Sequence, residues 1–325
     1  MTDKPTLSFQ SKLQYRDVAF VGGDVFFAAG GLHPMSRSRS AYCATLGCFD
    51  TNGRTIWETT IPKCWPFTRV VANSRQVAAI IPSNFVREFC GLVIFDACTG
   101  SIVAKLPVDA DDLALSPEGN VAIGAHRGVS VVRVVKIPEA IVIRTCEFSP
   151  EVEFASKAIK RVRDFRNEQL LITFDCQMKS AYRASHEVWP LDASQPAIRI
   201  VEKKRNECLL IEDRIITWEW NSDHGTIAFY SLQDGKQLGL VDPKRGPLET
   251  VACYSKDLVI ACFDDGQLAS IHLPSGEVRP IANLSPEAGW NGIRPLTESN
   301  RFLLMETGNH QAPRTDFSIW NMADR

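Results

Sequence analysis

Residues 91 to 107, GLVIFDACTGSIVAKLP, contain the unit from which most of this sequence is built. An apolar run ends at Asp96, a short polar turn closes on Gly100, and a second apolar run follows. Two such runs joined by a turn that contains Asp and Gly are typical of a β-hairpin. The stretch therefore predicts two antiparallel strands joined by a tight turn.

Related turns recur along the chain. They read DTNG (50 to 53), DACTG (96 to 100), LQDG (232 to 235) and LPSG (273 to 276), with LDASQ (191 to 195) as a degenerate copy. The strands expected before the turns end 39 to 56 residues apart, at Asp50, Asp96, Val135, Leu191, Ser231, Leu273 and Asn321. A four-stranded blade of a β-propeller takes roughly 40 to 50 residues. The sequence predicts an all-β fold, a seven-bladed β-propeller of four-stranded antiparallel blades, as a single domain over residues 1–325.

Individual strands follow from the apolar runs between the turns. We expect blade one at 17–21, 25–29, 42–49 and 54–61, blade two at 68–72, 77–81, 92–96 and 101–106, blade three at 112–115, 120–124, 129–135 and 141–148, and blade four at 162–165, 170–174, 187–191 and 197–201. Blades five and six are expected within 208–241 and 250–284. Residues 152–162 show helical spacing instead and predict a short loop helix.

The seventh unit has only three expected strands, near 293–296, 302–306 and 317–320. A blade without its outer strand would leave an open sheet edge and an unclosed ring. Residues 6–13, TLSFQSKL, form a strand-like run that belongs to no other blade. We expect this N-terminal strand to join the C-terminal blade and close the ring.

Composition narrows the class of protein. The chain has 36 Lys and Arg against 38 Asp and Glu, a formal net charge of −2. A protein that mainly binds nucleic acid or an anionic membrane normally has a clear basic excess. No apolar run approaches the roughly 18 residues of a membrane helix, and MTDKPTLSFQSKLQ lacks the apolar core of a secretory signal. The sequence predicts a cytoplasmic protein with no membrane partner, whose ten cysteines are mostly buried, reduced thiols.

Two groups of repeats resemble those of known propellers. IFDACTGSIVA (94 to 104) resembles the quinoprotein-type repeat A-x-D-x-x-T-G-x-x-x-W, and CFDTNGRTIW (48 to 57) is a copy one residue short that keeps the tryptophan. SPEGNVAIGAHRGVSVVRV (116 to 134) and FSIWN (317 to 321) are more similar to WD40 repeats. Ala104 replaces the tryptophan in the second blade, and most units lack the Gly-His and Trp-Asp pairs of WD40 repeats. The resemblance implies a propeller and leaves the activity open.

One face of the expected propeller has long loops. They are 30–41, 62–67, 82–91, 149–161, 175–186, 243–249, 285–292 and 307–316. Blades seven, one and two would be neighbours, so their loops predict one partner-binding surface, formed by His33, Arg37, Arg39, Trp65, Phe67, Phe85, Arg87, His310 and Arg314. Arginine and large aromatic residues dominate protein interfaces. The alternative is that these are ordinary solvated loops whose aromatic residues cover the ends of the core.

The sequence gives less support to nucleic-acid binding, metal binding and nucleophilic catalysis. Basic residues of this face, such as Arg37 and Lys157, could meet phosphates, but Asp109 and Asp264 on the same face oppose a nucleic-acid partner. Five of the six histidines, His186 among them, fall in or beside these loops without the spacing that brings metal ligands together, so no metal or other cofactor is expected. No G-x-S-x-G motif occurs.

Two classes of function stay open. The sequence favours a non-catalytic scaffold or adaptor that binds a protein or peptide through the long-loop face. The alternative is a propeller enzyme of quinoprotein or lactonase type that acts on a small molecule at the central channel. Such an enzyme would normally bring several polar residues to the channel mouth, and no such cluster stands out at the starts of the expected inner strands.

Overall fold

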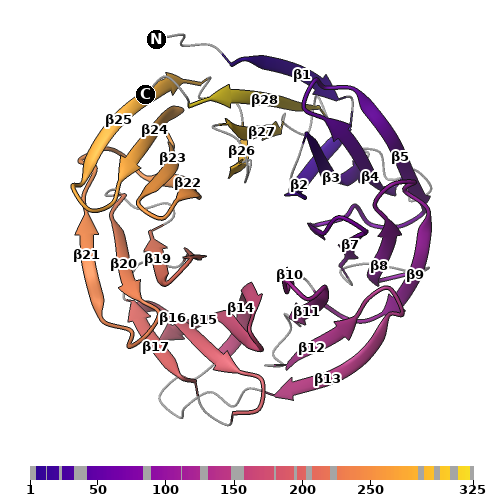
Figure 1. Ribbon diagram of the computed structural model, residues 1–325, viewed down its shortest axis with the longest axis horizontal. Coiled ribbons are helices and arrows are strands. Elements are labelled where there is room, and N and C mark those ends of the chain that lie inside the picture. Colours follow the sequence, from indigo (N-terminus) through magenta and orange to yellow (C-terminus); the bar gives the residue numbers. More distant parts are fainter. Residues whose placement is uncertain are drawn as a thin grey trace. The chain divides into compact units, whose positions relative to one another are not determined.

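In a computed structural model, the chain forms seven four-stranded antiparallel sheets, the blades of a seven-bladed β-propeller (Figure 1). The fold class predicted from the turns is thereby confirmed. The structure describes residues 5–11, 13–21, 24–32, 42–82, 89–110, 112–124, 131–147, 157–178, 181–193, 196–202, 207–219, 225–284, 289–295, 301–307 and 314–322.

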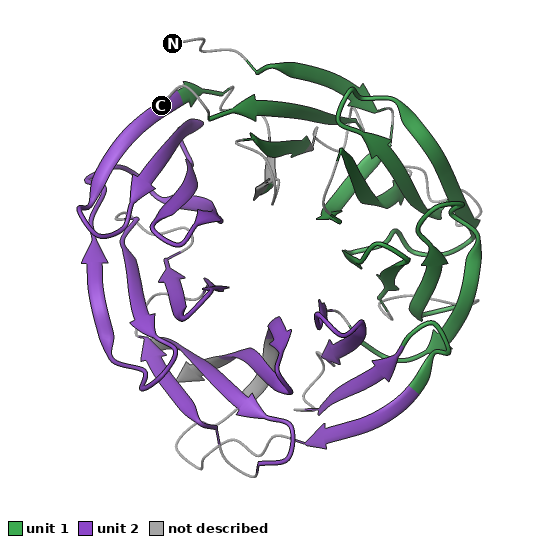
Figure 2. Ribbon diagram, in the orientation of Figure 1, with its two compact units in different colours: residues 1–111, 137–141, 282–325 green, residues 112–136, 142–281 purple. Residues whose placement is uncertain are grey.

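Two compact units divide the chain (Figure 2). The first unit comprises residues 1–111, 137–141 and 282–325, and the second comprises 112–136 and 142–281. Each unit is described separately below, and the single domain expected over 1–325 stays a prediction.

Blades one, two and seven belong to the first unit. Blade one consists of β2 (Gln14–Phe20), β3 (Val25–Leu32), β4 (Cys43–Asp50) and β5 (Thr55–Pro62), and blade two of β6 (Arg69–Ala72), β7 (Gln76–Ile81), β8 (Gly91–Asp96) and β9 (Ile102–Pro107). Blade seven combines β26 (Gly289–Pro295), β27 (Arg301–Thr307) and β28 (Thr315–Asn321) with β1 (Leu7–Ser11).

Most of the remaining strands lie in the second unit. Blade three consists of β10 (Asp112–Leu115), β11 (Asn120–Gly124), β12 (Val131–Lys136) and β13 (Ile141–Glu147), and blade four of β14 (Lys157–Arg166), β15 (Gln169–Met178), β16 (Ala181–Pro190) and β17 (Ile198–Glu202). Blade five consists of β18 (Glu207–Ile211), β19 (Arg214–Trp218), β20 (Ile227–Ser231) and β21 (Gln237–Val241), and blade six of β22 (Leu248–Ser255), β23 (Leu258–Phe263), β24 (Gln267–His272) and β25 (Glu277–Asn283).

The N-terminal strand completes the last blade, as the sequence predicts. β1 pairs antiparallel with β28, with Leu7 opposite Ile319 and Ser11 opposite Thr315. The side chain of Phe9 then lies among aromatic rings of blades one and seven, 5.1 Å from the Phe317 ring between centroids. The strand therefore adds apolar contacts as well as backbone hydrogen bonds.

The helix expected at 152–162 is wrong where the structure describes it. Residues from Lys157 onward belong to β14, a strand with two β-bulges. Each bulge inserts one extra residue into the alternation of a strand, so apolar residues recur every three positions at Ile159, Val162 and Phe165. That spacing imitates a helix.

The long loop expected at 175–186 is also corrected. β15 and β16 continue as a hairpin until Met178 lies opposite Ala181. The polar sequence of this segment suggests a loop, but backbone pairing does not require apolar side chains. His186, expected in or beside this loop, is a buried residue of β16.

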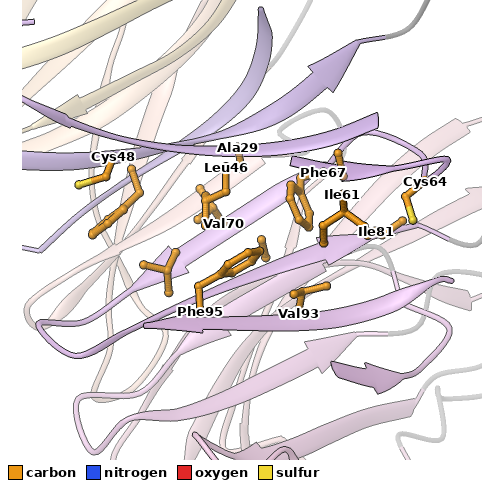
Figure 3. Packing of buried hydrophobic residues seen from close by; sticks show 14 of the residues in the cluster. Ala29, Leu46, Cys48, Ile61, Cys64, Phe67, Val70, Ile81, Val93 and Phe95 are labelled. Atoms are coloured by element: carbon orange, nitrogen blue, oxygen red, sulfur yellow. The ribbon is translucent and has the colours of Figure 1, made fainter. Parts of the chain in front are cut away.

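The core consists of separate apolar layers between neighbouring blades. Between blades one and two, Leu46, Phe67 and Phe95 are fully buried (Figure 3). The burial of side chains depends on the position of each strand in its blade. The strand β8 is buried almost throughout, whereas the outer strand β9 is half exposed. The inner strands thus provide the core, and their ends place the loops.

The turns that define the repeat cap themselves, as expected from their sequence. The carboxylate Oδ1 of Asp96 accepts hydrogen bonds from the backbone N–H of Thr99 at 2.8 Å and from that of Cys98 at 3.1 Å. Asp50 accepts from the N–H of Arg54 at 2.8 Å in the same way. The hydrogen bonds from Thr99 hold the pKa of Asp96 below its usual value.

Candidate interaction surface

Three of the nine residues predicted for partner binding fall within the described part of the chain. They are Trp65, Phe67 and Arg314. The other six, His33, Arg37, Arg39, Phe85, Arg87 and His310, lie outside the described residues. The surface therefore stays a prediction, and the structure describes only its edges, where the loops join the strands.

Trp65 lies in the link from β5 to β6 and is half buried. Its side chain packs against the apolar layer between blades one and two. The ring of Tyr42 stacks on it, with 5.3 Å between centroids and 19° between planes. The backbone N–H of Lys63 donates to the carbonyl oxygen of Tyr42 at 2.8 Å, which ties this link to the start of β4. The two rings thus sit on fixed backbone at the loop end of blade one.

Phe67 does not belong to a surface. Its side chain is fully buried and meets the Phe95 ring edge-on at 5.9 Å. Its backbone N–H donates to the carbonyl oxygen of Gly30 at 3.0 Å, which turns the side chain inward. The sequence places Phe67 in the correct link but does not show that its side chain points into the core.

Phe89 is an aromatic residue that the prediction omits. It stands at the end of the link between β7 and β8, half buried, and packs against the same apolar layer as Trp65. The ammonium group of Lys105 lies over its ring, 5.6 Å from the centroid, a cation–π contact. The loop sequence PSNFVREFCG contains two phenylalanines, of which the predicted surface includes only Phe85.

Arg314 is more than half exposed at the start of β28. Its Nε lies 3.2 Å from Oδ2 of Asp316, and the Nε2 of Gln10 donates to Oδ1 of the same carboxylate at 2.7 Å. Glu306 on β27 is the cross-strand neighbour of Asp316. Burial, reinforced by the charge of Asp316 and opposed by Arg314, raises the pKa of Glu306 to about 7.

Within the first unit, Trp65 and Phe89 pack on one apolar layer, and Tyr42 stacks on Trp65. The contact that the structure shows for Arg314 is instead with Asp316 of β28. We call Tyr42, Trp65 and Phe89 the aromatic group. Tyr42 and Phe89 extend the predicted surface, which already included Trp65.

A polar cluster in the second unit contains the side chains of a nucleophilic site, but its thiol is buried. Oγ1 of Thr173 lies 3.1 Å from Nδ1 of His186 and 3.2 Å from Sγ of Cys208. Burial disfavours the thiolate, but His186, Arg163 and Thr173 together outweigh it and lower the pKa of Cys208. The thiol is only 2% exposed, inside the layer between blades four and five.

Metal-ligand clusters and membrane-spanning helices are both absent from the described residues. Among them, no three His, Cys, Asp or Glu side chains gather as metal ligands. Nor does any helix in the described ranges have the length and apolar character needed to cross a membrane.

Comparison with known proteins shows the fold. No protein-family model matches the sequence, and no curated protein does so. The solved structure of U3-55K is similar, with a TM-score of 0.69 and 13% sequence identity over 97% of this chain and 99% of that one. At this identity the likeness concerns architecture alone, and it agrees with the seven four-stranded blades described above.

Proposed function

We propose that this protein is a non-catalytic interaction scaffold or adaptor that binds a protein or peptide through the loops of blades seven, one and two. The observation that carries the proposal is the aromatic group. Large aromatic side chains fixed on rigid elements and left partly exposed are the usual centres of protein interfaces.

The remaining predicted residues complete this proposal. His33, Arg37 and Arg39 precede Tyr42 in the chain, and Phe85 and Arg87 precede Phe89. The proposed surface thus has aromatic anchors with arginines in the adjoining loops. A cytoplasmic location belongs to the same proposal, in keeping with nine of the ten cysteines, which the structure shows as free thiols.

The test is recovery of partners from a native extract at low salt with the full chain and with the double variant W65A/F89A. We expect a stoichiometric macromolecular partner with the wild type and a loss of most of it with the variant. Y254A, which removes a half-buried aromatic residue of the second unit, is the control and should retain the partner. Thermal melting of all three proteins separates lost binding from lost folding.

Recovery of the partner by W65A/F89A at wild-type level would contradict the proposed surface. Recovery of a bound small molecule in place of any macromolecule would favour the enzyme alternative.

A further inference from the structure

Two lysines stand beside the aromatic group. Lys63 is exposed and lies two residues before Trp65 in the chain. Cys64, the residue between them, packs in the apolar layer of blades one and two (Figure 3). The ammonium group of Lys105 lies over the Phe89 ring, 5.6 Å from its centroid. Partly exposed rings with cations beside them suit a partner that has both apolar and acidic side chains.

The backbone that carries Lys63 is held in place. Its φ of +59° lies in the left-handed region, which residues with a side chain seldom adopt. Its N–H donates to the carbonyl oxygen of Tyr42 at 2.8 Å, and the Tyr42 ring stacks on Trp65. The backbone of the cation and of the two rings is thus fixed before a partner binds, which lowers the entropic cost of binding.

Blade one brings only positive charge to this surface. The link 30–41 ends next to Tyr42 and the link 62–67 contains Trp65, and neither link has an acidic residue. Their charged residues are Arg37, Arg39 and Lys63. The chain as a whole has a net charge of −2, so this concentration of positive charge is local. Interfaces match opposite charges, and the blade-one side therefore favours an acidic partner.

Blade two brings charges of both signs. Glu88 precedes Phe89 in the chain, and the exposed Asp109 follows β9, the strand that contains Lys105. A nucleic acid carries a negative charge at every nucleotide and would meet Asp109 and Glu88 unfavourably. A peptide can confine its acidic residues to the blade-one side and place apolar residues beside Phe89. The charges therefore favour a peptide over a nucleic acid.

We propose that the aromatic group binds an acidic linear peptide segment of a partner protein. Its acidic residues lie next to Lys63, and its apolar residues pack against Trp65 and Phe89. This inference rests on the proposed function, because it specifies the chemistry of the partner for the same surface. The aromatic rings provide the apolar contact, and the cations select the sign of charge and the orientation of the segment.

The test begins with selection from a random linear-peptide phage library against the immobilised full chain at low salt. We expect the enriched peptides to combine several Asp or Glu residues with aromatic or aliphatic residues. One enriched peptide is then synthesised with a fluorescent label, and its binding is measured by anisotropy. Higher salt should weaken this binding, because salt screens the attraction between exposed charges.

Charge-reversal variants test the orientation. K63E should weaken binding of the acidic peptide about fivefold or more, because it replaces attraction by repulsion. K105E should weaken it less, since the charges beside Phe89 are mixed, and equal losses would contradict the orientation. A peptide with lysine in place of its acidic residues should bind K63E better than the wild type. K256E, which reverses an exposed lysine of the second unit, is the matched control and should bind like the wild type. Thermal melting of each variant confirms that it folds.

Failure of this inference differs from failure of the proposed function. Neutral or basic peptides that bind the wild type but not W65A/F89A would overturn the acidic partner and leave the proposed surface standing. Peptides that bind W65A/F89A as tightly as the wild type, or no enrichment at all, would contradict the surface itself and this inference with it. A labelled single-stranded oligothymidylate that binds more tightly than the peptide, and that K63E weakens, would show a nucleic-acid partner and overturn the inference.

Discussion

The hydroxyl of Thr315 on β28 links both sides of the N-terminal segment. Its oxygen accepts a hydrogen bond from the backbone N–H of Tyr15 at 2.8 Å and donates one to the carbonyl oxygen of Leu13 at 2.9 Å. Thr315 is fully buried. One side chain thus satisfies two backbone groups where the chain passes from β1 into β2.

Replacement of Thr315 by valine tests this link. T315V keeps the shape but leaves a buried N–H and a partly buried C=O without their partner, so we expect the free energy of unfolding to fall by about 2 to 4 kcal/mol. S8A, which alters an exposed serine of β1, should change it by less than about 0.5 kcal/mol. Urea unfolding measures both. A T315V protein as stable as S8A would show that the hydroxyl does not hold the segment.

The closing strand itself can be weakened at Phe9. Its ring lies 5.1 Å from the Phe317 ring and 5.9 Å from the Phe49 ring, between centroids. F9A should lower the free energy of unfolding by about 2 kcal/mol because the ring is partly buried. Deletion of residues 1–13 should abolish cooperative unfolding, since it removes the whole outer strand of blade seven. A truncated protein that still melts cooperatively would contradict the role given to β1.

Trp57 and Gly100 form a contact between blades one and two that a substitution can probe. Gly100 has φ +69°, and an added Cβ would lie 2.4 Å from Cε3 of Trp57. Gly276 has the same φ, but its Cβ would meet only Val241 at 3.9 Å. G276A should therefore cost about 1 kcal/mol from backbone strain alone. G100A should cost at least about 2 kcal/mol more, because the indole cannot move without loss of packing.

A double-mutant cycle separates the two causes. In W57A/G100A the ring is absent. The loss of stability caused by G100A, measured relative to W57A, should therefore be only as large as that caused by G276A. Chemical denaturation of the four proteins measures the coupling. Additive effects of W57A and G100A would show that the contact carries no energy.

Glu306 makes stability depend on pH. Its folded pKa of about 7 is raised above the usual value near 4.5, chiefly by burial and then by Asp316. A raised folded pKa means that the folded state holds the proton more tightly, so this contribution is fully present below about pH 4.5 and is lost as pH rises through about 7. E306Q should remove this dependence and be more stable than the wild type at pH 8.

Measurement of melting temperature from pH 5 to pH 8 tests the assignment. D316N should leave part of the slope, because it removes the second cause and not the burial of Glu306. If the slopes of wild type and E306Q coincide, Glu306 does not titrate in this range.

The interaction surface shows where sequence reasoning reached its limit. Trp65 lies in the expected link, between β5 and β6. Phe67, two residues after Trp65, is buried. Phe89, which the prediction omits, completes the aromatic group. Burial of a loop side chain depends on which backbone group its residue bonds to, as the bond from Phe67 to Gly30 shows. No local pattern records that partner.

Strand assignment failed for the same kind of reason in blade four. The bulges of β14 depend on its pairing with β15, and the hairpin of β15 and β16 depends on backbone bonds that continue into polar sequence. The alternation of apolar and polar residues in the sequence shows neither the bulges nor the length of the hairpin.

Local rules sufficed wherever a residue acts on its own neighbours. Asp96 caps its own turn, Gly100 allows the reversal, and the regular recurrence of such turns determined seven blades and an outer strand taken from the N-terminus. Contacts between distant residues were decided only by the tertiary structure. The bond from Tyr15 to Thr315 and the stacking of Tyr42 on Trp65 join positions whose separation in the chain carries no signal, because their energy exists only once the blades have packed.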